Sequence, residues 1–505
     1  MSHDQRTAGY ATRYAWPVVF VMALALLWLR LGHWFYLSID EGIYLEGGRR
    51  VAGGQVPYRD FFVVTGPGSF WLYGAVFHFF GTTLANARFV LCCELAAICA
   101  AICSIVGRLT SVVFGTSSAA LFLAMLLTTP YPLYVTHRWD SNALALLALA
   151  LVVPGTAPGT GTRVRIFAAG ACAGTAVCVT PPILFVVILL VAWLAWTDAR
   201  TVRHFAVGLA LPLLAAAGVL VMQGAFGDFV RTVFWDASNY SSSNSLTYGA
   251  LTGSFQSFRR AGLPAGLAAY FDALWPVLLP PLAALACLRF HAPQGDGEKR
   301  FLWLLGAASV ASLAACYPRF GAAQLLFGSA FLWVFFCCAI GSLVPRLSYV
   351  WVALCVLLAA AGWPKADLRR IETPVGTLNV SKLHHVFLNN LLAPVKPGQD
   401  VFVYPYLPAL YFALGVENPT RYSWLQPGMM GPRDVESVLA SLRAKPPRWI
   451  IWHDFTREFI LKNWPSSDRA RLRFPEMESY FSANYHVVTP DGVVPLGYRL
   501  LEHNQ

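Results

Sequence analysis

The first 363 residues alternate between long apolar stretches and short polar links. A helix that crosses a bilayer needs about 20 predominantly apolar residues, and stretches of roughly that length recur along this region. They lie near residues 16–36, 86–107, 111–130, 141–154, 166–180, 182–197, 205–222, 273–288, 301–316, 322–343 and 348–363. The pattern therefore predicts an α-helical polytopic membrane protein with about eleven transmembrane helices.

After Trp363 the pattern changes. The segments "DVFVYPY" and "PRWIIWHDF" alternate as β-strands do, and "DVESVLASLRA" between them has the spacing of an amphipathic helix. The sequence thus predicts a transmembrane domain over residues 1–363 and a soluble α/β domain over residues 364–505.

Basic residues set the predicted orientation. The formal net charge is +11, but Lys and Arg stand singly or in pairs between apolar stretches, which favours a membrane protein and no nucleic-acid partner. If the N-terminus is cytoplasmic, the cytoplasmic links carry Arg108, Arg163, Arg165, Arg200, Arg203, Arg289, Lys299, Arg300 and Arg346. The external side then receives the first loop (residues 37–85), three further links and everything after Trp363.

The first external loop begins with two adjacent carboxylates, Asp40 and Glu41, and continues as "GGRRVAGGQVPYRDFF", which contains Arg59. This stretch is too polar to span a bilayer, so we expect it on the membrane surface. A carboxylate at this position could deprotonate a hydroxyl nucleophile, or it could cap a helix N-terminus. Position alone leaves both interpretations open.

Other external links add further polar residues. "THRWDSN" supplies His137, Arg138 and Asp140, with Asp140 a candidate N-cap, and "YPRFG" supplies Arg319, which could also snorkel to the interface. The loop from Gln223 to Asp272 adds Arg259 and Arg260 and is rich in Ser, Asn and Gly, so it could act as a lid or as a solvated linker. Because separate links bring acids and cations to one face, we predict a single functional site there.

The first loop, "DEGIYLEGGRRVAGGQVPYRDFF", resembles that of the GT-C membrane glycosyltransferases that use polyprenyl-phosphate sugars. These include protein O-mannosyltransferases (glycosyltransferase 39-like), lipid A aminoarabinose transferases and lipopolysaccharide galacturonosyltransferases. The acidic start, the "G-PYRDFF" end and the place after the first helix carry the resemblance, and the "YPRF" link and the tail "FVYPYLPALYFALGVENPTRY" extend it.

The resemblance implies an inverting glycosyltransferase of the bacterial inner membrane, with its site and C-terminal domain in the periplasm. Asp40 would be the base and Asp140 the second acidic residue, while cations would hold the phosphate of the polyprenyl-phosphate sugar. Two cations of the family pattern are replaced here, because Thr65 follows "DFFVV" and Thr180 precedes the paired prolines. Arg138, Arg319, Arg59 or the pair Arg259 and Arg260 are therefore the candidate phosphate ligands.

A divalent cation such as Mg or Mn could assist at Asp40 and Asp140, although no sequence feature demands one. The cysteines fall in apolar stretches without metal-ligand spacing and predict packing residues only. The acceptor, a lipid, glycan or protein hydroxyl, is not determined by the sequence.

Two other classes of protein have the same gross composition. A polytopic transporter or lipid flippase would also carry basic links, but it would show charges or broken helices near mid-span, whereas these charges gather at helix ends. A sensor that binds ligand through the tail would leave the first loop without a role.

Overall fold

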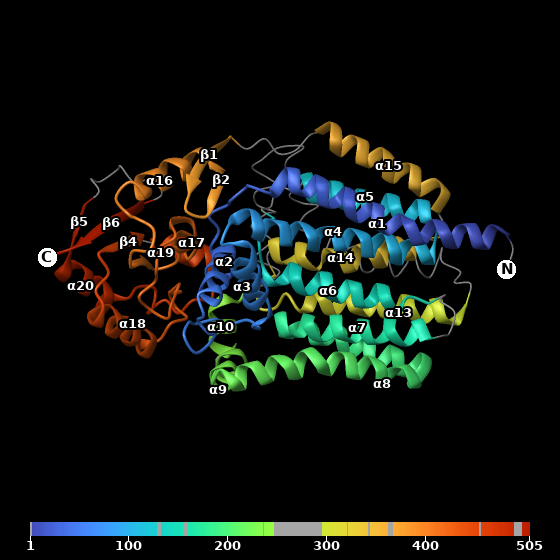
Figure 1. Cartoon of the computed structure of the whole chain (residues 1–505), viewed down its shortest axis with the longest axis horizontal. Helices are drawn as coiled ribbons and strands as arrows, with labels where there is room; N and C mark the ends of the chain where they lie inside the picture. The colour runs from blue at the N-terminus through green and yellow to red at the C-terminus, as the bar shows by residue number, and fades with distance from the viewer. Residues whose placement is uncertain are drawn as a thin grey trace.

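The computed structural model describes residues 3–128, 133–154, 160–235, 237–246, 295–320, 322–341, 344–361, 367–453, 456–488 and 497–504. Its elongated helices lie side by side, and the C-terminal domain covers one end of them (Figure 1). The helices before the C-terminal domain are α1 (His3–Leu31), α2 (Ile39–Ala52), α3 (Gly68–Phe80), α4 (Leu84–Leu109), α5 (Val112–Thr128), α6 (His137–Val152), α7 (Thr160–Val179), η1 (Pro181–Ile183), α8 (Leu184–Met222), α9 (Phe226–Val230), η2 (Arg231–Trp235), α10 (Ala237–Asn244), α13 (Asp296–Ala314), α14 (Ala322–Ala339) and α15 (Val344–Ala361).

Ten of the eleven predicted apolar stretches coincide with these helices, and residues 273–288 lie outside the described part of the chain. Within the described residues, three helices are long and apolar enough to cross a membrane, namely Leu84–Leu109, Gly161–Val179 and Pro181–Met222. Shorter apolar helices include Ala15–Leu31, Val112–Thr128, Gln324–Ala339 and Arg346–Ala359. The helical fold is confirmed, and the count of eleven spans stays a prediction.

Helix α8 contains a chain reversal. Asp198 leaves the helical conformation, with φ −155° and ψ 93°. Thr180, just before the first limb, is hydrogen-bonded to His137, and Gln223, just after the second limb, accepts a hydrogen bond from Arg59. Both ends of α8 therefore lie at the same end of the bundle, which agrees with the two separate stretches predicted at 182–197 and 205–222.

The C-terminal domain combines two small sheets with short helices. Its elements are β1 (Leu368–Thr373), β2 (Gly376–Ser381), α16 (Lys382–Leu392), β3 (Val401–Tyr404), α17 (Ala409–Leu414), α18 (Pro432–Ala444), β4 (Trp449–His453), α19 (Arg457–Asn463), α20 (Pro475–Asn484), β5 (Tyr485–Val487) and β6 (Tyr498–His503). Strands β1 and β2 form a hairpin, and the larger sheet has the order β3-β4-β6-β5, with β3 parallel to β4 and the other pairs antiparallel. The strands and helix predicted from "DVFVYPY", "PRWIIWHDF" and "DVESVLASLRA" correspond to β3, β4 and α18.

The larger sheet separates two cores because neighbouring strand residues point to opposite faces. Val401 and Val403 belong to a core shared with the membrane helices, whereas Phe402 and Tyr404 belong to a second core on the other side. The C-terminal domain is thus packed onto the helices through one face of its sheet.

Helix α2 lies between the helices and the C-terminal domain. We expected this polar stretch on the membrane surface, but Gly42, Tyr44, Glu46 and Arg50 are buried. Close packing explains the difference: a Cβ at Gly42 would lie 2.1 Å from the backbone nitrogen of Ala409 in α17. Glycine at this position therefore lets α17 rest directly on α2.

Replacing Gly42 by Ala should lower the free energy of unfolding by about 1–3 kcal/mol, because the added methyl group overpacks the contact with α17. A lower midpoint of thermal unfolding in purified protein would show the effect. Gly218→Ala is the control, since a Cβ there meets nothing within 4 Å. Equal midpoints for the two variants would contradict the tight contact.

Candidate active site

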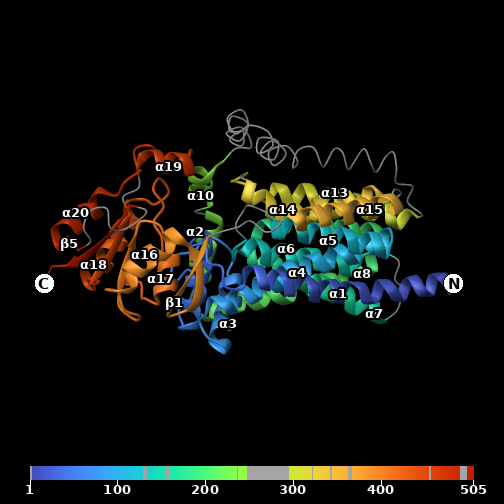
Figure 2. The same cartoon turned by 90° about the horizontal axis from the view of Figure 1, so that it is seen from above.

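A cavity of about 280 Å³ lies where the helices meet the C-terminal domain. Four of the predicted site residues line it: Asp40 from α2, His137 and Arg138 from the start of α6, and Arg319 from the link before α14. Helix α10, which follows the second limb of α8, also reaches the cavity, and Figure 2 shows it at the junction of the two parts. The structure thus brings residues from separate links, each predicted to be external, into one site.

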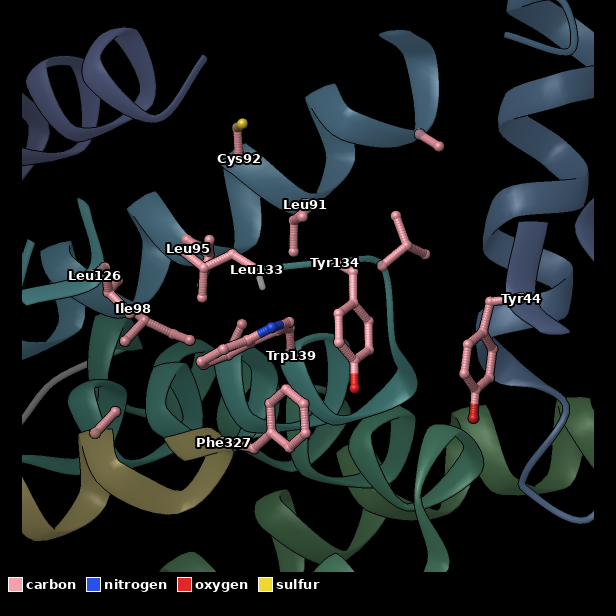
Figure 3. Packing of buried hydrophobic residues seen from close by; sticks show 14 of the residues in the cluster. Tyr44, Leu91, Cys92, Leu95, Ile98, Leu126, Leu133, Tyr134, Trp139 and Phe327 are labelled. Atoms are coloured by element: carbon pink, nitrogen blue, oxygen red, sulfur yellow. The ribbon is translucent and has the colours of Figure 1, made fainter. Parts of the chain in front are cut away.

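Asp40 is held by a tyrosine. The hydroxyl of Tyr134 donates a 3.0 Å hydrogen bond to Oδ2 of Asp40. Among the described residues no hydrogen bond reaches Oδ1, so this oxygen is left for a group in the cavity. The ring of Tyr134 packs near Trp139 and Phe327, and its hydroxyl points the same way as that of Tyr44 (Figure 3). Packing of the ring fixes the donor, and the donor in turn orients the carboxylate.

Glu41 turns away from the cavity and forms a buried ion pair. Its Oε1 lies 2.8 Å from Nη2 of Arg88, and both side chains are 0% exposed. Burial raises the pKa of Glu41, and the Arg88 guanidinium lowers it in part. The pair also ties down the neighbouring link, since Arg88 donates to the carbonyl of Leu133 (2.9 Å) and Val135 donates to Glu41 (3.2 Å).

The two carboxylates therefore hold the same segment from two sides. Glu41 and Arg88 fix the backbone of Leu133 and Val135, and the tyrosine between them reaches Asp40. Neither carboxylate caps α2, whose N-cap is Ser38. Asp40 thus lines the cavity, whereas Glu41 pairs with Arg88 behind it and holds the backbone of the neighbouring link.

The two cations of the cavity have few partners. Arg138 donates to the carbonyl of Ala315 (3.3 Å), and Nη2 of Arg319 donates to the carbonyl of Asn463 (2.9 Å). Nη1 of Arg319 is buried and has no hydrogen-bond partner among the described residues. Buried donors are nearly always paired, so the cavity offers a charged donor to an anion.

His137 completes this side of the cavity. Its Nδ1 lies 2.7 Å from the hydroxyl of Thr180, and its ring lies 5.4 Å from that of Tyr44. The Thr180 hydroxyl therefore orients the His137 ring at the edge of the cavity.

Two other predicted residues, Arg59 and Asp140, do not line the cavity. Arg59 is on the exposed side of its loop, where it pairs with Asp60 at 2.8 Å. Asp140 is 2% exposed, does not line the cavity and accepts a hydrogen bond from the Ser69 hydroxyl. It does not cap α6, whose N-cap is Thr136. Arg259 and Arg260, with most of the predicted lid, lie outside the described residues.

Comparison with family models found no match, and comparison with curated proteins found no match either. Several solved structures are similar. The Archaeoglobus fulgidus oligosaccharyltransferase, tethered with an acceptor peptide containing the NVT sequon, aligns with a TM-score of 0.50 at 12% identity over 97% of this chain and 74% of that chain. The chain has the GT-C fold.

ArnT from Cupriavidus metallidurans, bound to undecaprenyl phosphate, aligns with a TM-score of 0.46 at 15% identity over 96% of this chain and 97% of that chain. The match to the oligosaccharyltransferase, at a TM-score of 0.50, confirms the resemblance predicted from the first loop as a resemblance of fold. At these identities the chemistry has to be argued from the site itself.

Within this GT-C fold, the predicted metal ligands do not share a site. Asp40 lines the cavity, whereas Asp140 is bonded to Ser69 outside it. Across the described ranges, no group of three or more His, Cys, Asp and Glu side chains gathers as metal ligands do. The donor set therefore does not fit a shared site for Mg or Mn at Asp40 and Asp140.

Sequence reasoning missed two groups of residues at the site: Tyr134, which holds Asp40 without lining the cavity, and three aromatic residues that do line it. Tyr134 stands in the "YPLYVTHRWD" link, but no local signal distinguishes it from its neighbours. Tyr406, Trp424 and Trp464 of the C-terminal domain line the cavity. Their positions are far apart in the sequence, so only the fold brings them together.

Proposed function

We propose that this chain is an inverting glycosyltransferase that moves a sugar from a polyprenyl-phosphate donor to an acceptor hydroxyl. The observation that carries the proposal is one cavity in which a carboxylate, Asp40, faces two cations, Arg138 and Arg319. A base and an anion site are the two groups that a direct displacement of a phosphate from a sugar requires. The GT-C fold, shared with an oligosaccharyltransferase, supports the same chemistry.

The proposed step is a single displacement. Asp40 takes the proton of the acceptor hydroxyl as its oxygen bonds to the anomeric carbon of the donor sugar. The bond from that carbon to the phosphate oxygen breaks, and the electron pair leaves with the polyprenyl phosphate. Arg138 and Arg319 stabilise the charge on this leaving group, and attack from the opposite face inverts the anomeric configuration.

The distribution of cations supports a periplasmic site in the bacterial inner membrane. Arg108 donates to Ala150, Arg165 to Leu151 and Arg300 to Trp196, so these basic links gather around the ends of α6 and of the first limb of α8. The cavity lies at the opposite end of both elements, beside His137 and Thr180. Because basic links favour the cytoplasm, the cavity and the C-terminal domain would face outward.

The place of the cavity also separates this proposal from a transporter. Transporters bind their substrates near mid-span, between broken helices. Here the cavity is at the helix ends and under the C-terminal domain.

Purified protein in lipid nanodiscs, supplied with a radiolabelled polyprenyl-phosphate sugar and cell-envelope acceptors, should release polyprenyl phosphate. Absence of donor turnover with all common donor sugars would overturn the proposal.

Arg319→Ala and Arg138→Ala should each lower kcat/KM for the donor by at least about tenfold, because each removes a charge-assisted contact to phosphate. Initial rates at varied donor concentration would measure the loss, and circular dichroism would verify folding. Arg59→Ala is the control, since Arg59 is exposed and paired with Asp60 away from the cavity. Unchanged donor kinetics in both cavity variants would place the phosphate site elsewhere, with Arg259 and Arg260 next to be tested.

A further inference from the structure

The C-terminal domain gives the cavity a wall of three aromatic rings, here called the aromatic wall: Tyr406, Trp424 and Trp464. The Tyr406 ring packs edge to face against Trp424 at 5.4 Å and against Trp464 at 5.1 Å between centroids. The three side chains are 6%, 2% and 6% exposed, respectively. They present fixed ring surfaces to the cavity.

Backbone hydrogen bonds hold the wall in place. The amide of Leu425 donates to the carbonyl of Pro405 at 2.7 Å, which joins the segments of Trp424 and Tyr406. The amide of Trp464 donates to the carbonyl of Ile460 at 2.7 Å, which ties Trp464 to the end of α19. A ligand that binds to this wall meets rings that are already ordered, so binding loses little conformational entropy.

Polar groups surround the rings. The indole Nε1 of Trp424 is buried and has no hydrogen-bond partner among the described residues. Tyr406 and Asp40 line the same cavity. Burial raises the pKa of Tyr406 well above its usual value, and the negative charge of Asp40 raises it further, so the Tyr406 hydroxyl stays protonated. The wall therefore combines flat apolar faces, an unpaired donor and access to Asp40.

A pyranose ring matches this combination. Its C–H face can lie on an aromatic ring, while its hydroxyls around the edge can accept from an indole N–H and donate to a carboxylate. A peptide acceptor would need partners for its backbone amides, and an acyl chain offers no hydroxyl. A cavity of about 280 Å³ also admits a terminal sugar more readily than a folded protein surface.

We propose that the aromatic wall binds a saccharide and that the acceptor of the transfer is a sugar hydroxyl, from either a glycan or a glycolipid. This inference rests on the proposed function and narrows it to one acceptor class. The sugar lies on Tyr406 and Trp464 with one hydroxyl directed to Asp40. That hydroxyl loses its proton to Asp40 as its oxygen bonds to the donor sugar.

Acceptor choice by the unmodified protein is the first test. The full chain in nanodiscs receives a labelled polyprenyl-phosphate sugar with four separate acceptor pools: intact envelope glycolipid, oligosaccharide released from it, a Ser/Thr-rich peptide and phospholipid. Label in the released oligosaccharide shows that a glycan suffices, and label in the intact glycolipid alone identifies a glycolipid acceptor. Both results support the inference. Label that goes mainly to peptide or phospholipid overturns it.

Substitution of the wall is the second test. Trp464→Leu and Trp424→Leu should each raise the acceptor KM about tenfold or more, and the donor KM should change much less. Trp449→Leu is the matched control, because Trp449 is 3% exposed in the same domain and does not line the cavity. A donor KM that rises as much as the acceptor KM, or equal effects in the control, would overturn an acceptor role for the wall.

The two proposals fail in different ways. If no variant and no wild-type protein turns over any donor, the glycosyltransferase proposal fails. If donor is consumed but saccharides are not labelled, only the acceptor inference fails.

Discussion

Replacing Asp40 by Asn should lower the turnover of donor and acceptor by about 10² to 10⁴, the usual contribution of general-base catalysis. The amide keeps the size of the side chain and can still accept the hydrogen bond from Tyr134, so the cavity should keep its shape. What the variant loses is the ability to take a proton from the acceptor hydroxyl. Rates of sugar transfer by purified protein, compared at saturating donor, would measure this effect.

Asp60→Asn is the matched control for this experiment. Asp60 belongs to the same loop, but its side chain is 30% exposed and pairs with Arg59 outside the cavity. We expect this variant to transfer sugar at close to the normal rate. Retention of more than about a tenth of kcat by Asp40→Asn would instead show that Asp40 has a structural role.

Breaking the pair of Glu41 and Arg88 should have the largest effect on stability. Removing one partner of a buried ion pair typically costs about 3–5 kcal/mol, because the other charge is left buried. Glu41→Gln should be the more damaging change, since the Arg88 guanidinium cannot lose its proton. Arg88→Met should be milder at low pH, because Glu41 can then be protonated. Midpoints of thermal unfolding at pH 5 and pH 8 would measure both effects.

The sign of the pH effect follows from burial. In Arg88→Met, Glu41 keeps the burial that raises its pKa and loses the guanidinium that lowers it, so its pKa in the folded state exceeds its unfolded value. Protonation then favours the folded state, and stability falls as the pH rises through the folded-state pKa. Asp60→Asn again serves as the control, since removal of this carboxylate should not make stability fall as the pH rises. A pH-independent loss in Arg88→Met would contradict the assignment.

Loss of transfer in the Glu41 and Arg88 variants would have a physical explanation as well. The pair fixes the backbone on both sides of Tyr134, and Tyr134 orients Asp40. A change behind the site therefore alters the position of the proposed base.

The sequence by itself determined the class of fold. Apolar stretches of about 20 residues have few alternatives to membrane helices, because backbone groups in lipid must be hydrogen-bonded within their own segment. The alternating pattern of the tail likewise predicted β3 and β4. Successive side chains of a strand point to opposite faces of the sheet, so the sequence itself displays the alternation. Alternation of the links also predicted that Asp40, Arg138 and Arg319 would meet at one end.

Only the tertiary structure decided which polar residues enter the cavity. Asp40 and Glu41 are neighbours, but successive residues of a helix point in directions about 100° apart, so one faces the cavity and the other faces Arg88. Arg59 and Arg138 are equally basic in the sequence, yet Asp60 holds the first on the surface.

The aromatic wall is the clearest case of a feature that the sequence pattern did not predict. Tyr406, Trp424 and Trp464 lie on three separated segments of the C-terminal domain, and packing of that domain onto α2 sets them against the cavity. Contacts between distant segments depend on how whole faces fit together, and no local periodicity encodes that fit. Local pattern thus determined the elements and the side on which the chemistry lies, whereas long-range packing selected the side chains that line the cavity.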